Sequence, residues 1–186
     1  MPDRCPWAKS PPMIEYHDTE WGMPMHDDRL WFEFMVLNAF QAGLTWELIL
    51  KRRPAFRQAF ANFDPVLVAA FGPKDKERLL ADAGIIRNRL KIEAAIHNAA
   101  LFIDVQQEFG SFDQYIWEFV DGKTLHNRWQ NFEEIPAVSE DAKTISQALI
   151  KRGFKFVGPT ICYAMMQATG MVNDHLVSCF RHSQLL

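Results

Sequence analysis

The feature that most constrains the fold is a succession of short apolar runs with helical spacing and almost no strand-like alternation. Residues 30–40 (LWFEFMVLNAF) are apolar on most faces, which indicates a buried helix. Residues 85–108 place Ile92, Ala95 and Ala99 at the spacing of an amphipathic helix. The sequence therefore predicts an all-α fold with about eight short helices.

Caps and breakers give the expected helix boundaries. The first 25 residues, rich in proline and aromatics, are expected to be irregular. A helix that begins at Thr45 is expected to end before Pro54, because proline disfavours helical backbone in the residue that precedes it. Residues 123–138 are expected to form a loop anchored by Trp129 and Phe132. The other helices are expected at 66–71, 74–83, 85–108, 111–120, 139–152 and 160–168.

Size and composition favour one domain, residues 1–186, built as two helical lobes that share a cleft. The chain has 186 residues, of which 48% are hydrophobic, and these are enough for a buried core. No run approaches the roughly 20 apolar residues of a membrane span, and the first residues do not resemble a signal peptide. A cytoplasmic protein that contacts no membrane is expected. The net charge of −3 excludes a broadly basic coat, so any contact with nucleic acid must be local.

Residues 151–180 contain a turn suited to phosphate. Lys151 and Lys155 flank a glycine turn, and Gly158-Pro159 then leads into an apolar helix. The first N–H groups of a helix lack intrahelical partners and lie at its positive dipole end. Pro159 suits the first helical position, where no N–H is needed. This segment is the best candidate for a local anion contact.

Four residues are candidate zinc ligands: Cys5, His17, His175 and Cys179. Three cysteines in a chain of this length do not make a disulfide framework. His175 and Cys179, four residues apart, would face the same way on a helix. Their spacing with Cys5 and His17 is no standard zinc finger, and the residues alone slightly favour a buried thiol and a hydrogen-bonded core histidine. A zinc ion with four protein ligands would be structural, because no position is left for water.

Aromatic residues gather in or beside the segments expected to be irregular. Trp7, Tyr16, Trp21 and Trp46 can sandwich a planar base, and electron-rich rings favour a cationic one. The commoner role of such residues is to attach the N-terminal segment to the core. Leu44, at the tip of the turn 41–46, can wedge into a base stack. The residue pattern by itself favours a buried Leu44 that acts as a plug, packed between two helices.

Six blocks of residues together resemble DNA-3-methyladenine glycosylase I, of the alkyladenine branch of the helix-hairpin-helix DNA glycosylases. They follow one another with matching order and spacing between Cys5 and Cys179. The blocks are RCPW at 4–7, YHDTEWG at 16–22, FQAGLTW at 40–46, AGIIRN at 83–88, KRGFKFVG at 151–158 and VNDH at 172–175.

This resemblance implies a helix-hairpin-helix glycosylase fold whose structural zinc joins the N- and C-terminal segments. It implies ligation by Cys5, His17, His175 and Cys179, in place of the buried-thiol interpretation. The implied activity is monofunctional hydrolysis of the N-glycosidic bond of 3-methyladenine, after the base is flipped from double-stranded DNA. A monomer in the bacterial cytoplasm without an obligate protein partner is expected.

The resemblance also assigns site residues. The base pocket falls on Tyr16, Trp21 and Trp46, with Trp7 at its edge and Met13 where the family has a further tyrosine. Tyr16, Trp46 and Asn38 form the implied catalytic set. DNA contacts fall on the wedge turn and on the hairpin with the start of the next helix, namely Gly43, Leu44, Lys151, Lys155, Gly158 and Thr160.

Two positions bear on the chemistry. Asn38 stands where the family has a pocket glutamate, and Asn173 stands where related hairpin glycosylases carry a catalytic aspartate, which the alkyladenine branch lacks. A neutral Asn38 predicts weaker recognition of a cationic base, or a shift in the preferred base through its NH₂ donor. Glu47 offers a replacement carboxylate, although a solvent-facing position is favoured. A third hypothesis is a lesion-binding protein that no longer cleaves.

Overall fold

The computed structural model describes residues 3–186, and helices make up nearly all of their regular structure. β1 and β2 form one short parallel pair, with Leu125 opposite Val172 and His126 opposite Asn173. The expected helical class is confirmed. The elements are α1 Pro11–Thr19, α2 Asp28–Gln41, α3 Trp46–Ala59, η1 Ala61–Phe63, α4 Pro65–Ala69, α5 Pro73–Ala81, α6 Arg89–Phe109, α7 Phe112–Trp117, η2 Glu118–Val120, β1 Leu125–His126, η3 Phe132–Glu134, α8 Glu140–Lys151, α9 Pro159–Ala168, β2 Val172–Asn173 and α10 Phe180–Gln184.

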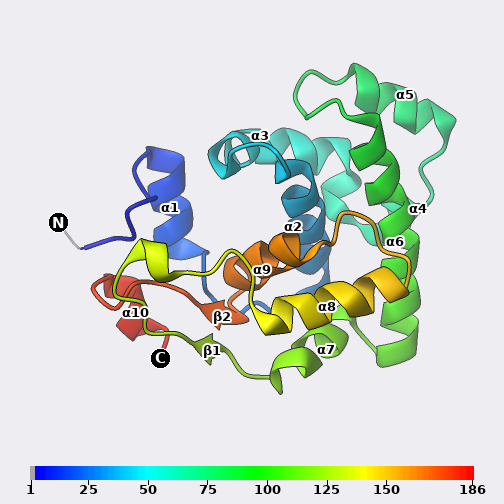
Figure 1. Cartoon of the computed structure of the whole chain (residues 1–186). Helices are drawn as coiled ribbons and strands as arrows, with labels where there is room; N and C mark the ends of the chain where they lie inside the picture. The colour runs from blue at the N-terminus through cyan, green and yellow to red at the C-terminus, as the bar shows by residue number, and fades with distance from the viewer. Residues whose placement is uncertain (1–2) are drawn as a thin grey trace.

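Helix α2 is the central element of the core. Every residue from 31 to 40 is buried, as the apolar run predicts. In Figure 1, α3 lies across the top of α2, with α4 to α6 to the right of α2 and the N-terminal α1 and the C-terminal α10 to its left. The aromatic core beneath α2 includes a stacked pair, Phe102 and Phe112, whose ring centroids are 4.3 Å apart. Burial of one such ring stabilises the fold by about 1.5–3 kcal/mol.

The N-terminal segment is not wholly irregular, contrary to the expectation, because it contains α1. Ser10 takes the extended N-cap conformation, and Pro11 and Pro12 occupy the first helical positions. Proline is favoured there, since its N–H would have no intrahelical partner and its φ already suits a helix. The two prolines therefore start a helix. They do not prevent one.

Helix α3 continues through Pro54 to Ala59, so the expected end before the proline is wrong. A proline inside a helix costs about 3 kcal/mol. Tertiary contacts offset this cost: Phe56 is fully buried and its ring lies 4.9 Å from that of Phe40. Arg53, directly before the proline, donates to the buried carboxylate of Glu33 at 2.5 Å.

Helix α6 begins at Arg89, four residues later than expected, because the Asn88 side chain caps it by accepting from the Lys91 N–H at 3.2 Å. Helix α7 begins where the sequence predicts, because the Ser111 hydroxyl caps it by accepting from the Gln114 N–H at 2.9 Å. Phe132 does not anchor its loop in the core, since its side chain is 45% exposed. Trp129 does pack against a buried cluster.

His175 and Cys179 do not share a helix, and this expectation is also wrong. His175 follows β2 in irregular backbone, and Cys179 is the N-cap residue of α10. The i, i+4 argument therefore does not bring these two side chains together. Any proximity between them comes from the tertiary fold.

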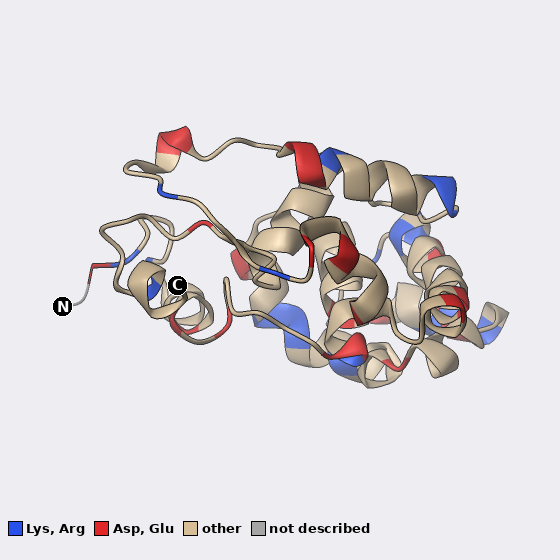
Figure 2. Cartoon of the chain, turned by 90° about the horizontal axis from the view of Figure 1, so that it is seen from below, with Lys and Arg blue, Asp and Glu red and all other residues tan. Residues whose placement is uncertain are grey.

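Charged residues are spread over the whole chain. Figure 2 shows Lys and Arg interspersed with Asp and Glu along the elements, in agreement with the net charge of −3. Among the described residues, no helix has both the length and the apolar character to cross a membrane.

Candidate functional site

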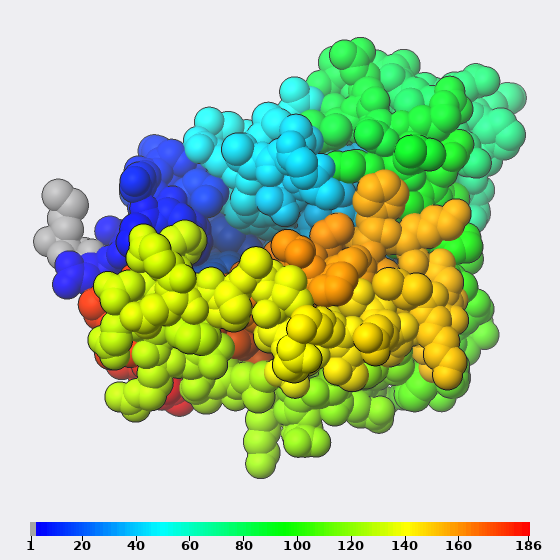
Figure 3. Space-filling view, viewed as in Figure 1, coloured from blue at the N-terminus to red at the C-terminus, as the bar shows by residue number. Residues whose placement is uncertain are grey.

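A cavity of about 450 Å³ lies where α1, α2, α3 and α9 meet the loop that follows β1. Figure 3 shows a recess on this face, between the blue N-terminal segment, the cyan start of α3 and the yellow loop. All six residues expected to hold a base line it: Trp7, Met13, Tyr16, Trp21, Asn38 and Trp46.

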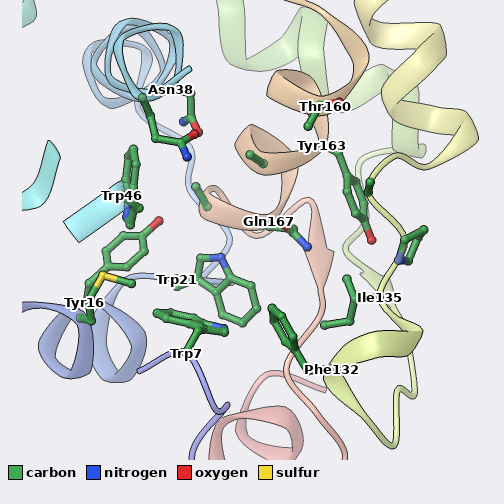
Figure 4. A pocket seen from close by; sticks show the side chains of 16 residues that line it. Trp7, Tyr16, Trp21, Asn38, Trp46, Phe132, Ile135, Thr160, Tyr163 and Gln167 are labelled. Atoms are coloured by element: carbon green, nitrogen blue, oxygen red, sulfur yellow. The ribbon is translucent and has the colours of Figure 1, made fainter. Parts of the chain in front are cut away.

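Aromatic rings form two walls of the cavity (Figure 4). Tyr16 and Trp46 lie 5.5 Å apart between centroids, and Trp46 stacks on Phe34 behind it at 6.5 Å. Trp7 and Trp21 pack edge to face at 5.0 Å. Ring faces held in this way provide stacking surface at little cost in side-chain entropy. The cavity is suited to a planar ring.

Tyr16 presents a neutral hydroxyl. Burial raises the pKa of its phenol well above the usual value, and the nearby Glu20 raises it further. Both effects disfavour the charged phenolate. The hydroxyl is therefore available as a hydrogen-bond partner and not as a base.

Asn38 lines the cavity and retains an unpaired acceptor. Its side-chain NH₂ donates to the backbone carbonyl of Phe34, one helical turn earlier, at 2.8 Å. A carbonyl only accepts, so the amide nitrogen must be the atom that faces Phe34. The Oδ1 atom makes no hydrogen bond to another described residue. It can accept from a ligand.

The turn between α2 and α3 carries an exposed leucine. Leu44 is 36% exposed, so the plug interpretation is wrong. Gly43 has a φ of +79°, a conformation that favours glycine. The turn is fixed from below by Lys91, whose ammonium donates to the carbonyls of Phe40 at 2.8 Å and Ala42 at 2.6 Å. Leu44 is thus held outward on a rigid support.

The turn between α8 and α9 presents two lysines to solvent. Lys151 and Lys155 are both exposed, and Gly158 is the N-cap of α9. Asn98 of α6 fixes this turn twice, accepting from the Lys155 N–H at 2.9 Å and donating to its carbonyl at 2.8 Å. Thr160, in the first turn of α9, also lines the cavity. The expected phosphate contact therefore lies beside the expected base pocket.

Cys5, His17 and Cys179 form a buried cluster in which their potential ligand atoms all lie within 4.8 Å of one another. His17 Nε2 is 3.4 Å from Cys179 Sγ. His17 Nδ1 is 2.8 Å from Asp18 Oδ1, which favours the tautomer in which Nε2 is unprotonated. The Cys5 thiol, by donating to Cys179, lowers the pKa of the Cys179 thiol to about 4.

His175 lies beside this cluster. Its ring centroid is 4.9 Å from that of His17, and its buried Nε2 has no hydrogen-bond partner. Its Nδ1 is 3.1 Å from Asn173 Oδ1. Burial lowers the pKa of His175 to about 3, so the ring is neutral, as a metal ligand must be. Two thiols and two imidazole nitrogens fit a zinc ion.

Several residues of the cavity were missed by the sequence analysis. Tyr163 and Gln167 line it from α9, on the same helical face as Thr160. Tyr163 follows Thr160 by three residues and Gln167 follows Tyr163 by four, and this helical spacing is a signal that could have identified them. Phe132 and Ile135 line it from the loop, and no sequence pattern indicates this.

Two candidate carboxylate or amide positions lie outside the cavity. Glu47 faces solvent and pairs with Lys51 at 2.8 Å, as its helix-start position predicts. The Asn173 side chain is fully buried, accepts from the His175 N–H at 3.3 Å and donates to the His182 carbonyl at 3.2 Å. Neither residue lines the aromatic cavity.

These features define a helical protein that can hold one planar ring in an aromatic cleft, beside an exposed wedge residue and a helix N-terminus. A family model described as methyladenine glycosylase matches residues 7–182, and the chain belongs to this family of enzymes.

Individual relatives agree with this assignment. The chain is 47% identical to DNA-3-methyladenine glycosylase 1 of Escherichia coli (strain K12) over 95% of each chain. It is similar to a crystal structure of 3-methyladenine DNA glycosylase I, with a TM-score of 0.93 and 46% identity over 96% of this chain and 98% of the other. It is also similar to a tyrosine-to-phenylalanine variant of 3-methyladenine DNA glycosylase I in complex with 3-methyladenine, with a TM-score of 0.90 and 32% identity over 92% of each chain.

Proposed function

We propose that this protein hydrolyses the N-glycosidic bond of 3-methyladenine in alkylated double-stranded DNA, as a step of base-excision repair. The observation that carries the proposal is the aromatic cavity, in which Asn38 offers a hydrogen-bond acceptor between walls that suit one planar ring. The relative solved in complex with 3-methyladenine supports the same ligand for this chain.

DNA is held on both sides of the cavity. Leu44, supported by the turn that Lys91 fixes, enters the base stack and fills the gap left by the flipped nucleotide. Lys151, Lys155 and the N–H groups that begin α9 contact phosphate through charge and helix dipole. The flipped base then enters between the Tyr16–Trp46 and Trp7–Trp21 walls.

The chemistry requires a base that is already a good leaving group. The residues that line the cavity include no Asp, Glu, Lys or Arg, so no charged side chain is placed there to protonate a leaving group or to form a Schiff base. An N3-methylated adenine nucleotide is already cationic. The bond from the anomeric carbon to the base breaks with its electron pair moving to the base, which leaves as neutral 3-methyladenine. Water adds to the anomeric carbon and loses one proton, leaving an abasic site.

Asn38 favours 3-methyladenine over a base with an altered edge. Since its NH₂ already donates to Phe34, the free Oδ1 accepts from a donor on the base, such as an exocyclic amine. A base that presented only acceptors would leave this atom without a partner, at a cost of about 1–3 kcal/mol. Altered base preference through the NH₂ group is therefore the weaker alternative.

We propose that Cys5, His17, His175 and Cys179 bind one structural zinc ion. The carbonyl of Asn173 and the carboxylate of Asp18 each approach the Nδ1 of a proposed histidine ligand, and such contacts fix the ring orientation. Trp21 packs against His175 at 4.5 Å, so the same residues support a wall of the cavity.

The test is mass spectrometry of the bases released from methylated DNA and from deaminated DNA. Release of 3-methyladenine from methylated DNA is expected. Release of a different base would show altered preference. Failure to release any base, with binding to DNA containing an abasic analogue retained, would show a lesion-binding protein and contradict the proposal.

A further inference from the structure

Asp174 is a buried carboxylate directly behind the cavity. Its side chain is fully buried and accepts four hydrogen bonds, all from side chains. Oδ1 accepts from Asn127 Nδ2 and from Trp129 Nε1, each at 2.7 Å. Oδ2 accepts from the Tyr163 hydroxyl at 2.5 Å and from Gln167 Nε2 at 2.8 Å. No other side chain of the proposed site is held by so many partners.

These four donors come from two separate walls. Tyr163 and Gln167 belong to α9 and line the cavity themselves (Figure 4). Asn127 and Trp129 belong to the loop that carries other lining residues, such as Ile135. Asp174 therefore joins the α9 wall to the loop wall and fixes the orientation of two polar side chains that face a ligand.

The charge of Asp174 has no cationic partner. Within residues 3–186, the ion pairs do not include Asp174. Glu33, the other deeply buried carboxylate with several partners, is paired with Arg53 and Arg57. Neutral donors stabilise a buried carboxylate but do not cancel its charge. Its field is felt most strongly in poorly solvated space such as the adjoining cavity.

We propose that Asp174 is a positioning residue whose buried negative charge makes the cavity prefer a cationic ring over a neutral ring of the same shape. The inference rests on the proposed function, in which the flipped base is a cation. Asn38 contributes the hydrogen-bond acceptor, and Asp174 contributes the charge from behind Tyr163 and Gln167. A cavity without lining carboxylates thereby still distinguishes an alkylated base from an unmodified one.

The experiment compares two planar probes at pH 8, the cation 1-methylquinolinium and neutral quinoline. Their dissociation constants are measured by calorimetry with the wild-type protein and with Asp174→Asn. Wild-type protein is expected to bind the cation more tightly. Asp174→Asn is expected to weaken binding of the cation by roughly tenfold and that of quinoline by less than about twofold.

Asp28→Asn is the matched control. Asp28 is also a carboxylate held by neutral donors, the N–H groups of Phe112 and Asp113 and Nε2 of Gln106, but it does not line or adjoin the cavity. This control is expected to leave both dissociation constants unchanged. Native mass spectrometry of each variant checks that metal content is equal, because Asp174 neighbours His175.

A charge swap guards against misfolding. The double variant Asn127→Asp with Asp174→Asn moves the carboxylate to a residue within hydrogen-bond distance. The double variant is expected to keep most of the preference for the cation. It therefore tests the inference even if Asp174→Asn alone does not fold. The inference is overturned if Asp174→Asn loses affinity for both probes equally, or if the double variant binds both probes with equal affinity. Base release from methylated DNA tests the proposed function separately, since neither probe requires cleavage.

Discussion

At the scale of single residues, the proposed contact of Asn38 with the flipped base predicts how a charged side chain at this position would act. A hydrogen bond to a charged group contributes about 1.5–3 kcal/mol, against about 1 kcal/mol for a neutral pair. Asn38→Glu would replace the unpaired amide oxygen by a carboxylate, with one more methylene to reach the base. We expect release of 3-methyladenine from methylated DNA to rise several-fold, measured as single-turnover rate.

The control for this prediction is Asn38→Gln. Glutamine has the length of glutamate without its charge, so it separates reach from electrostatics. Rates for Asn38→Gln at or below the wild-type rate are expected. An equal rise in both variants would mean that length, and not charge, limits recognition by the wild-type protein.

Leu44 gives a second prediction at this scale. Leu44 is 36% exposed on a fixed turn, so its removal should act mainly on the engagement of DNA. We expect Leu44→Ala to slow base release from duplex DNA by roughly tenfold, because the gap in the stack is no longer filled. Release from single-stranded DNA should change little.

Leu67→Ala serves as the control for the wedge. Leu67 is an exposed leucine on α4 that does not line the cavity. Thermal midpoints and release rates from both substrates are expected to match the wild type. A similar loss for Leu44→Ala on single and double strands would rule out the wedge role.

At the scale of elements, the α8–α9 turn should supply affinity for DNA without supplying base selectivity. Lys151→Ala and Lys155→Ala are expected to weaken binding to duplex DNA while leaving binding of free 3-methyladenine unchanged. Removing one lysine–phosphate ion pair should reduce the slope of log affinity against log salt by about 0.9. Fluorescence anisotropy over a salt series measures this slope.

Lys123→Ala is the matched control for these lysines. Lys123 is exposed and follows η2, so it carries the same charge on another part of the chain. For Lys123→Ala, the slope of log affinity against log salt should equal that of the wild type. Equal changes for Lys123 and Lys155 would indicate a diffuse charge effect in place of a local contact.

The start or burial of a helix could be predicted where a single local sequence feature determines it. The capping of α7 by Ser111 and the burial of residues 31–40 follow from sequence patterns that the structure repeats. The continuation of α3 through Pro54 could not be predicted, because it depends on Phe56 meeting Phe40 across the core. Helix α1 was missed for another reason, since a proline-rich segment is typical of irregular structure even where its prolines begin a helix.

At the scale of the whole molecule, the cavity is built from segments far apart in the sequence. The expected aromatic residues do meet there, but Phe132 and Ile135 reach it through a loop whose path no sequence pattern specifies. The resemblance to a family predicted that the aromatic residues line the cavity, whereas only the folded structure shows that Phe132 and Ile135 also line it. The same holds for Asp174, whose four partners lie 7 to 47 residues away along the chain.

The proposed zinc ion would connect the two ends of this molecule, since Cys5 and His17 precede the core and Cys179 follows it. Closing so long a loop restricts the unfolded chain, and structural zinc contributes folding energy directly. We expect one zinc ion per chain by native mass spectrometry, and chelation that lowers the thermal midpoint by at least about 10 °C. Base affinity should fall more than DNA affinity, because Trp21 rests on His175 whereas Asn98 holds the α8–α9 turn. Cys179→Ser should lose the metal. Cys162→Ser, which changes a buried thiol outside the cluster, should keep it. A chain that holds no zinc in metal-preserving buffer would exclude the proposed link between the two ends.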